Sequence, residues 1–290
     1  MNVSICSISF RHHLISIGDM AAWARSAGFQ GIELWGVHAR NLVAYPERNG
    51  AWLDDYGLSV PMISDYLPLD ADVLMLRQKT IELCQLAGKW GAAKIRTFAG
   101  KTASKSASGE ERRLIASRLR DVCDVAASYG IYLLAETHPG TLADTAASTL
   151  RLIEEVDHPF FAINFDALHV WEGGDDPVAI RRRMGAAIRH YHLKNVRHRK
   201  DLGVFQPANV YAPGGDRRGM TALFEGALDY SLFLSDLVED ADVEASLEWF
   251  GGNCQETLRN DLTQVRQMMA ARRQREVSSR HRFEPSHRDL

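Results

Sequence analysis

The order of predicted elements indicates a single (β/α)₈ barrel of the α/β class. Short segments rich in β-branched and aromatic residues alternate with amphipathic helical segments along most of the chain. Parallel strands need crossover connections, so this alternation predicts a parallel sheet flanked by helices. The chain of 290 residues accommodates one such barrel, which typically takes about 250 residues. The alternative, a doubly wound open sheet, would carry a glycine-rich phosphate loop, and neither GxGxxG nor GxxxxGKS/T occurs.

Eight segments have the length and composition of buried strands. Most are bounded by turn residues or by a helical pattern, and eight parallel strands close most economically into a barrel. The predicted strands are residues 3–9, 31–35, 59–64, 94–98, 132–136, 161–166, 190–194 and 244–249.

The helices between these strands carry recognisable end signals. Asp19 precedes an apolar stripe that ends at Gly28, where a helix C-cap belongs. Asp70 opens a longer helical pattern, and Asp176 followed by Pro177 is an N-cap with proline at the first helical position. The last residues, 273–290, are polar and charged without apolar periodicity. We therefore expect one barrel domain over residues 1–272, followed by a flexible tail.

Composition excludes several classes of function. The formal net charge of −3 provides no basic field for nucleic acid or for an anionic membrane surface. The four cysteines are scattered, with no CxxC pair and no disulfide framework, which is typical of a reducing cytosol. No segment has the pattern of a signal peptide or of a transmembrane helix. These features predict a cytoplasmic protein.

Metal-binding residue types stand at the ends of four successive predicted strands. Active sites of (β/α)₈ barrels lie where the strands end, so such residues should meet there. Glu136, Asp166, His192 and Glu248 each occupy one of these positions. Three carboxylates would repel one another without a cation, because unpaired buried charges are costly. The set of three carboxylates and one imidazole predicts one divalent ion, Mg²⁺, Mn²⁺ or Co²⁺, with open positions for substrate oxygens.

Further polar residues are predicted to face the same mouth. His138 and Lys194 each lie two residues beyond a proposed ligand, and strand alternation aims them to the same side as that ligand. Lys194 beside a metal would stabilise an enolate. Arg96 ends the fourth strand and is predicted to clamp a substrate anion. Tyr66 follows the third strand. Glu33 lies on the second strand and is predicted to contact the substrate; the alternative is that it braces another side chain.

The motifs GFQGIELW, LLAETH, NFDALH, HYHLKN and SLEWF resemble the xylose-isomerase-like superfamily of TIM-barrel sugar isomerases, epimerases and dehydratases. Within it, the runs MISDYL, KIRTFAG, ETHPGTLADT and NVYAPGGDRRGM are similar to the 3-dehydroshikimate dehydratases of petrobactin-type siderophore biosynthesis. The resemblance covers about residues 2–270. It implies the same four metal ligands. It also implies a substrate pocket lined by Tyr66, Arg96, His138, His169, Lys194, Phe205 and Phe250.

The resemblance implies a hydro-lyase that dehydrates 3-dehydroshikimate to 3,4-dihydroxybenzoate, for siderophore assembly or aromatic catabolism. His138 would be the general base, while the metal and Lys194 would stabilise the enolate. The alternative is a sugar-phosphate isomerase or ketose 3-epimerase with the same ligands. Those epimerases use two metal-bound glutamates as acid and base, and the extra His138 and Lys194 favour elimination. An apurinic-site endonuclease or a non-enzymatic sugar-binding barrel fits less well. The expected partners are the small-molecule substrate and further copies of the chain, without nucleic acid or membrane.

Overall fold

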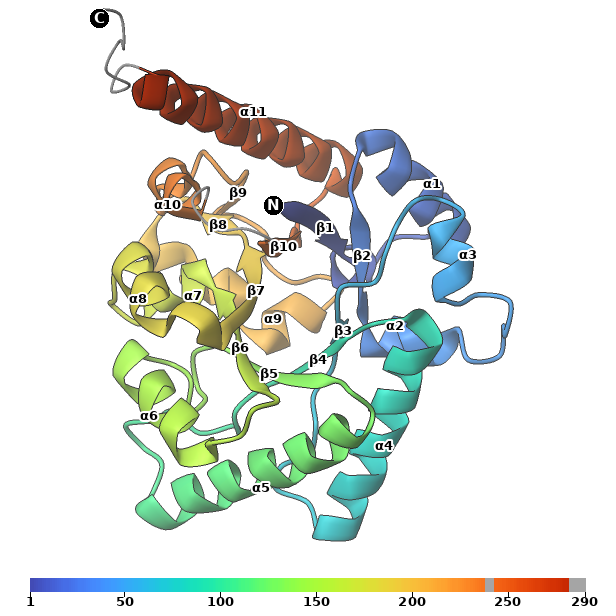
Figure 1. The fold of residues 1–290 in the computed structure, drawn as a ribbon, viewed down its shortest axis with the longest axis vertical. Helices are drawn as coiled ribbons and strands as arrows, with labels where there is room; N and C mark the ends of the chain where they lie inside the picture. Colours follow the sequence, from blue (N-terminus) through green and yellow to red (C-terminus); the bar gives the residue numbers. More distant parts are fainter. Residues whose placement is uncertain (238–242, 282–290) are drawn as a thin grey trace, which may run out of the picture.

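In this computed structural model, eight parallel strands close into a barrel surrounded by helices (Figure 1). The structure describes residues 1–237 and 243–281, and for residues 272–281 it describes the backbone only. Around the barrel the strands follow the order β1, β2, β3, β4, β5, β6, β7 and β10. Their bounds are β1 Asn2–Cys6, β2 Gly31–Trp35, β3 Ile63–Ser64, β4 Lys94–Thr97, β5 Tyr132–Glu136, β6 Phe161–Asp166, β7 Ile188–Leu193 and β10 Glu244–Leu247. The predicted barrel is confirmed.

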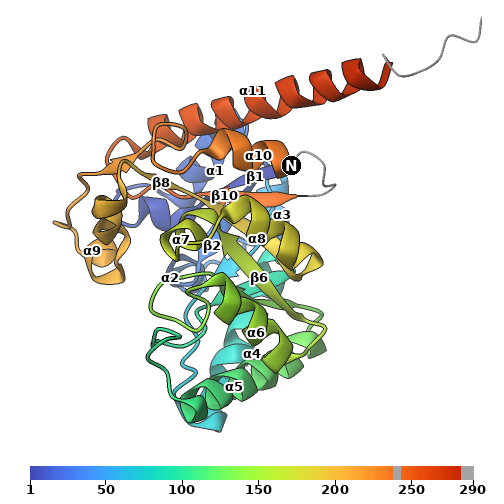
Figure 2. The ribbon, with the colours of Figure 1, turned by 90° about the vertical axis from the view of Figure 1, so that its left-hand side faces the viewer.

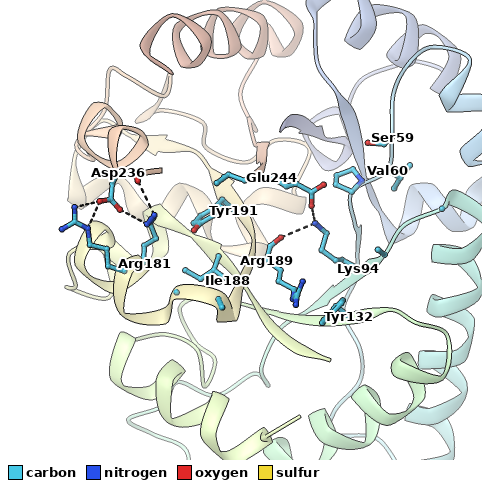
Figure 3. A pocket seen from close by; sticks show the side chains of 17 residues that line it. Ser59, Val60, Lys94, Tyr132, Arg181, Ile188, Arg189, Tyr191, Asp236 and Glu244 are labelled. Atoms are coloured by element: carbon cyan, nitrogen blue, oxygen red, sulfur yellow. Dashed lines mark hydrogen bonds and ion pairs between the residues drawn. The ribbon is translucent and has the colours of Figure 1, made fainter. Parts of the chain in front are cut away.

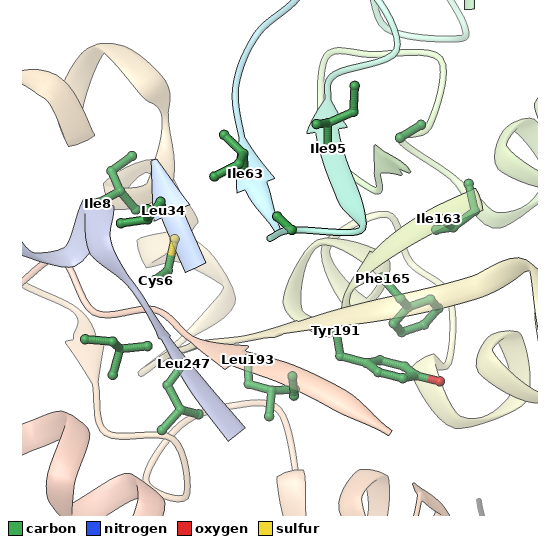
Figure 4. Packing of buried hydrophobic residues seen from close by; sticks show 14 of the residues in the cluster. Cys6, Ile8, Leu34, Ile63, Ile95, Ile163, Phe165, Tyr191, Leu193 and Leu247 are labelled. Carbon is green, nitrogen blue, oxygen red and sulfur yellow. The ribbon is translucent and has the colours of Figure 1, made fainter. Parts of the chain in front are cut away.

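Helices cover the outside of the barrel because alternate strand residues are apolar and face them. Ile95, Ile163, Phe165 and Leu247 belong to one continuous apolar core between strands and helices (Figure 4). The longer helices are α1 Ile17–Ala27, α4 Val73–Trp90, α5 Gly109–Ser128, α6 Ala146–Val156, α8 Pro177–Met184, α10 Tyr230–Leu237 and α11 Cys254–His281. The shorter ones are α2 Gly36–Asn41, α3 Gly50–Asp54, α7 Ala167–Glu172 and α9 Pro207–Tyr211.

Two predicted helix starts differ from the structure, and both shifts have a local cause. The N-cap of α1 is Ser16, whose hydroxyl accepts from the backbone N–H of Asp19, so the helix begins before the predicted position. The N-cap of α4 is Asp72 and not Asp70. The predicted C-cap of α1 at Gly28, which has a left-handed φ of 96°, is confirmed. The predicted N-cap of α8 at Asp176, before Pro177, is confirmed as well.

The predicted third strand is reduced to Ile63–Ser64, with an isolated bridge between Gly31 and Ser59. Pro61 explains the interruption, because proline has no N–H to donate to the sheet. The last helix, in contrast, is longer than predicted. It continues to His281, beyond the predicted domain boundary at residue 272. Residues 273–281 contain neither proline nor glycine, and helix-favouring residues extend the helix without an apolar stripe. The rest of the predicted tail, 282–290, lies outside the described residues.

A segment that the sequence does not predict crosses the mouth of the barrel. It begins with β8 Asn195–Val196, continues through a 3-10 helix, Arg199–Phe205, and α9, and ends with β9 Met220–Thr221. β8 and β9 pair antiparallel, so the two ends of this mouth segment are joined. Figure 2 shows α9 on the side of the barrel opposite the N-terminus, and α11 extending beyond the barrel body. No helix among the described residues is long and apolar enough to cross a membrane.

Candidate metal and substrate site

The barrel brings the four predicted metal ligands together at its C-terminal mouth. Glu136 and Asp166 are the last residues of β5 and β6, His192 lies near the end of β7, and Glu248 follows β10. Asp166 is the cross-strand partner of His192, so the two are adjacent by register. His192 Nδ1 lies 3.5 Å from an oxygen of Glu136 and 3.5 Å from an oxygen of Glu248. All four side chains are buried.

The charges and unsatisfied atoms of this cluster fit a divalent cation. Four buried carboxylates, Glu33, Glu136, Asp166 and Glu248, face two buried cations, Arg96 and Lys194. With neutral imidazoles, two negative charges remain uncompensated within this group, which a divalent ion would balance. His192 Nδ1 has no hydrogen-bond partner among the described residues. One ligand atom each from Asp166, His192 and Glu248 also lie within 4.8 Å of one another. The residues present therefore suit a hard, oxygen-preferring metal.

Lys194 and Arg96 are the internal counterions of the cluster. Lys194 Nζ lies 2.5 Å from Asp166 Oδ2 and 2.7 Å from Glu248 Oε2. Burial alone would lower the pKa of Lys194, but Asp166 and Glu248 raise it well above its ordinary value. Arg96 Nε lies 2.9 Å from Glu136 Oε2. Burial would raise the pKa of Glu136, and the charges of Arg96 and His192 hold it well below its usual range.

His138 is oriented as a neutral base beside this cluster. Its Nδ1 lies 2.7 Å from the carbonyl oxygen of Pro139. A carbonyl only accepts, so Nδ1 carries the hydrogen and Nε2 holds the lone pair. Burial, together with the neighbouring His169, lowers the pKa of His138 to about 3. The ring packs against Phe98 and His169, with centroids 4.2 and 4.6 Å away. His138 is therefore uncharged near neutral pH and lines the mouth cavity.

His169 also lines this cavity, and two carboxylates orient it. Its backbone N–H donates to Asp166 Oδ1 at 3.1 Å, which caps α7. Its Nδ1 lies 2.8 Å from Glu172 Oε2. Because a carboxylate accepts, this contact directs Nε2 away from Glu172, and Nε2 lies 3.8 Å from Asp166 Oδ2.

Glu33 is the predicted site residue that the structure places differently from the others. It is fully buried, and its carboxylate contacts His192 Nε2, at 3.0 Å from each oxygen. It is not among the residues that line the mouth cavity. Glu33 therefore lies beneath the cavity, behind His192. This position agrees with the alternative role considered for it, that of bracing another side chain.

Aromatic side chains enclose the cavity from the solvent side. Phe205 and Phe250 pack edge to face, and Lys194 Nζ lies 5.6 and 5.9 Å from their ring centres. Tyr66 packs over the Arg96 guanidinium at 5.1 Å. The cavity that remains is narrow, about 40 Å³.

Tyr211, which the sequence reasoning missed, completes the enclosure. It ends α9, and its hydroxyl donates to the Tyr66 hydroxyl at 2.6 Å. Its ring stacks on Trp35 with centroids 6.0 Å apart. Arg11 Nε donates to Val210 O at 2.7 Å, and Arg217 binds the same carbonyl, so α9 is fixed over the mouth. Only the run NVYAPGGDRRGM, which carries the family resemblance, marked this segment in the sequence.

Fold and site together define a (β/α)₈ barrel with a carboxylate-rich mouth of the kind that holds a divalent cation. The chain belongs to the xylose isomerase-like TIM barrel family, whose model matches residues 21–274. This confirms the family expected from the motifs.

Known proteins with the same fold include a curated relative of similar length. The 3-dehydroshikimate dehydratase of Bacillus anthracis is 46% identical over 272 residues, covering 90% of this chain and 95% of the relative. The structure of the probable 3-DHS dehydratase AsbF, involved in petrobactin synthesis in Bacillus anthracis, has a TM-score of 0.87 at 46% identity. That match covers 91% of this chain and 98% of the solved one.

A more distant structure shows the fold alone. The IOLI protein with a bound zinc atom has a TM-score of 0.73 at 14% identity, covering 94% of this chain and 98% of its own. The barrel architecture thus persists where most of the sequence has changed.

Proposed function

We propose that this chain is a metal-dependent 3-dehydroshikimate dehydratase, a hydro-lyase whose product is 3,4-dihydroxybenzoate (protocatechuate). The similarity to the Bacillus anthracis dehydratase over nearly the whole chain supports the substrate. The observation that carries the chemistry is His138, a neutral imidazole with its Nε2 lone pair free, lining the cavity beside Lys194 and the carboxylate cluster. Elimination next to a carbonyl needs such a base and a nearby positive charge for the enolate.

Glu136, Asp166, His192 and Glu248 would hold the cation, with Mg²⁺, Mn²⁺ or Co²⁺ suited to this donor set. When bound, the ion supplies Lewis-acid polarisation of the substrate carbonyl, which is worth several kcal/mol. In the metal-free protein, burial would lower the pKa of His192, but Glu33, Glu248 and Glu136 raise it well above its ordinary value. Metal binding therefore competes with a proton on His192.

The protein side chains carry the proton transfers. His138 Nε2 removes the proton at C4, which is acidic because it lies next to the C3 carbonyl. Lys194 holds its charge beside the enolate oxygen that develops. The electron pair then expels the C5 hydroxyl, which leaves as water once protonated by the imidazolium of His138. Loss of a C6 proton and protonation of the C3 oxygen give the aromatic ring.

The other lining residues would bind and enclose the ring. Arg96, with Tyr66 over its guanidinium, would hold the ring carboxylate or another ring oxygen. Phe205 and Phe250 would pack on the ring faces and exclude water, and His169 would bind a ring hydroxyl. Tyr66 and Tyr211, joined by the hydrogen bond between their hydroxyls, would border the substrate on the solvent side of this cavity.

The product would feed siderophore assembly, as the involvement of the Bacillus anthracis protein in petrobactin synthesis suggests, with aromatic catabolism as the alternative. The four free, buried cysteines support a reducing, cytoplasmic setting. We also propose a homo-oligomer, which light scattering would test.

The deciding experiment is a catechol assay on purified protein. Incubation with 3-dehydroshikimate should produce catechol absorbance, a chelator should abolish it, and Mn²⁺ or Mg²⁺ should restore it. Turnover of ketoses without catechol formation would instead establish the isomerase or epimerase alternative. Activity that persists in the presence of chelator would refute the metal dependence.

A further inference from the structure

Glu33 lies at the centre of a buried contact network one layer beneath the candidate metal ligands. Its carboxylate touches side chains from three strands, β1, β3 and β7. His192 Nε2 is 3.0 Å from each of its oxygens. His190 Nε2 is 3.3 Å from Oε2, and Cys6 Sγ is 3.5 Å from Oε1. The Ser64 hydroxyl donates to Oε1. All five residues are inaccessible to solvent.

The chemistry of a carboxylate assigns the hydrogen positions in this network. An ionised carboxylate has only acceptor sites, so each contacting group must present a hydrogen to it. His192 therefore carries its hydrogen on Nε2. In the neutral ring the lone pair is then on Nδ1, the atom that faces Glu136 and Glu248 and has no hydrogen-bond partner among the described residues.

His190 and Ser64 keep Glu33 in place. His190 Nε2 also lies 2.9 Å from Ser246 Oγ on β10, and its ring stands at 85° to that of His192. Ser64 lies on β3, the strand that pairs with β2, and its hydroxyl reaches Glu33 from there. Groups on several barrel strands thus fix one carboxylate with little freedom to rotate, as a precise metal site requires.

We propose that Glu33, held by His190 and Ser64, is a positioning residue that selects the Nε2–H tautomer of His192 and so presents Nδ1 to the divalent cation. This deepens the proposed function and depends on its metal site. Groups that orient a metal-bound histidine typically change metal affinity about 10- to 100-fold. The role also explains why Glu33 is absent from the cavity lining.

The test compares three substitutions at one position. Glu33→Met keeps a similar shape without an acceptor, Glu33→Ala is a second loss variant, and Glu33→Gln retains an acceptor oxygen for the Nε2–H. Mn²⁺ titration should show about 10- to 100-fold weaker binding for Glu33→Met and Glu33→Ala. Glu33→Gln should recover most of the affinity. In [¹⁵N]histidine-labelled, Mg²⁺-bound protein, His192 should be the Nε2–H tautomer in the unmodified chain and in Glu33→Gln, and a mixture in Glu33→Met.

The matched control is Glu244→Gln, because Glu244 is also a glutamate on a barrel strand, β10, but pairs with Lys94 away from the site. It should leave Mn²⁺ affinity within about 2-fold of the unmodified chain. A folded Glu33→Met or Glu33→Ala protein with unchanged Mn²⁺ affinity and an unchanged His192 tautomer overturns the positioning role alone. If the unmodified chain binds neither Mn²⁺ nor Mg²⁺, the proposed metal site fails and the positioning role fails with it.

Discussion

The two ends of the barrel each contain a lysine paired with a glutamate from the same region of the chain, yet only one end has the properties of a reactive site. At the N-terminal end, Lys94 pairs with Glu244 and donates to the carbonyl of Arg189 at 3.3 Å (Figure 3). At the mouth, Lys194 pairs with Glu248 and also with Asp166. The first lysine meets one carboxylate, and the second lies within a group that has more carboxylates than cations.

The larger cavity lies at the N-terminal end of the barrel, away from the candidate site. The cavity at the N-terminal end measures about 1080 Å³, compared with about 40 Å³ at the mouth. Its charged lining includes the ion pair of Arg181 with Asp236, at 2.9 Å, besides that of Lys94 with Glu244. In barrels of this kind the N-terminal face serves stability, and the strand ends serve chemistry. The surplus of negative charge, more than the empty volume, distinguishes the candidate site.

The largest expected effect is the loss of a metal ligand. Asp166→Asn should lower Mn²⁺ affinity strongly and dehydration by about 10³-fold or more, because several kcal/mol of carbonyl polarisation disappear. Metal titration and the catechol assay measure the two effects. Glu244→Gln, at the other end, should leave both unchanged. Equal loss in the two variants would mean that general damage to the barrel, and not the ligand, is responsible.

Removal of the proposed base should affect turnover without affecting the metal. His138→Ala should reduce kcat by about 10²- to 10⁴-fold, the usual contribution of general acid–base catalysis. Its Mn²⁺ affinity should remain within about 2-fold, because His138 is not among the proposed ligands. A His138→Ala protein that turns over at more than a tenth of the normal rate would exclude His138 as the base.

The two lysines test the comparison directly. Lys194→Met should cut kcat by about 10²- to 10³-fold, because the charge beside the developing enolate is lost. Lys94→Met should leave kcat within about 2-fold. Lys94→Met should lower the free energy of unfolding by about 1–3 kcal/mol, less than a fully buried pair, because the Glu244 side chain is 34% exposed. Urea unfolding and steady-state kinetics on both variants decide. Loss of activity in Lys94→Met would mean that the two ends are coupled.

The smallest expected effect lies outside both ends and provides a baseline for pH dependence. Burial raises the pKa of Asp261, on α11, to about 6, although it accepts from the backbone N–H of Leu223 at 2.9 Å. A raised pKa in the folded state means that the stabilising contribution is present at low pH and is lost as pH rises through about 6. Asp261→Asn keeps the acceptor and removes the charge.

The stability of Asp261→Asn relative to the unmodified chain should therefore rise by about 1–2 kcal/mol between pH 5 and pH 8. Urea unfolding at the two pH values measures this difference. Glu256→Gln, an exposed change on the same helix, should show no such trend. A difference for Asp261→Asn that is independent of pH would show that Asp261 does not titrate in this range.

Much of the fold and of the carboxylate cluster at the mouth could be predicted because both follow from local patterns. Parallel strands of a closed barrel end at one face, so strand-end residues such as Glu136 and Asp166 must converge whatever the helices do. Alternation along β7 also placed His192 and Lys194 on one side, as found. Strand length was less predictable, since Pro61 interrupts β3 although its neighbours have strand composition.

The rest depends on contacts between residues distant in the sequence. Glu33 could be assigned to the barrel interior, but its carboxylate faces His192 because of how β2 and β7 lie across the barrel. Tyr211 reaches Tyr66 only because Arg11 and Arg217 hold α9 over the mouth. No periodicity in the sequence encodes the path of a connection of this length.

The pairing of β8 with β9 has a consequence for how this protein could acquire new substrates. The segment between them is joined at its base by the Asn195–Thr221 pair, so its two ends stay together independently of what lies between them. It contributes Phe205 and Tyr211 to the cavity, while the proposed metal ligands belong to the barrel strands and their ends. Insertion, deletion or exchange of residues within this segment would change the size and polarity of the substrate ring that the cavity accepts. The carboxylates would stay where they are. The mouth segment and the carboxylate cluster thus belong to separate parts of the fold.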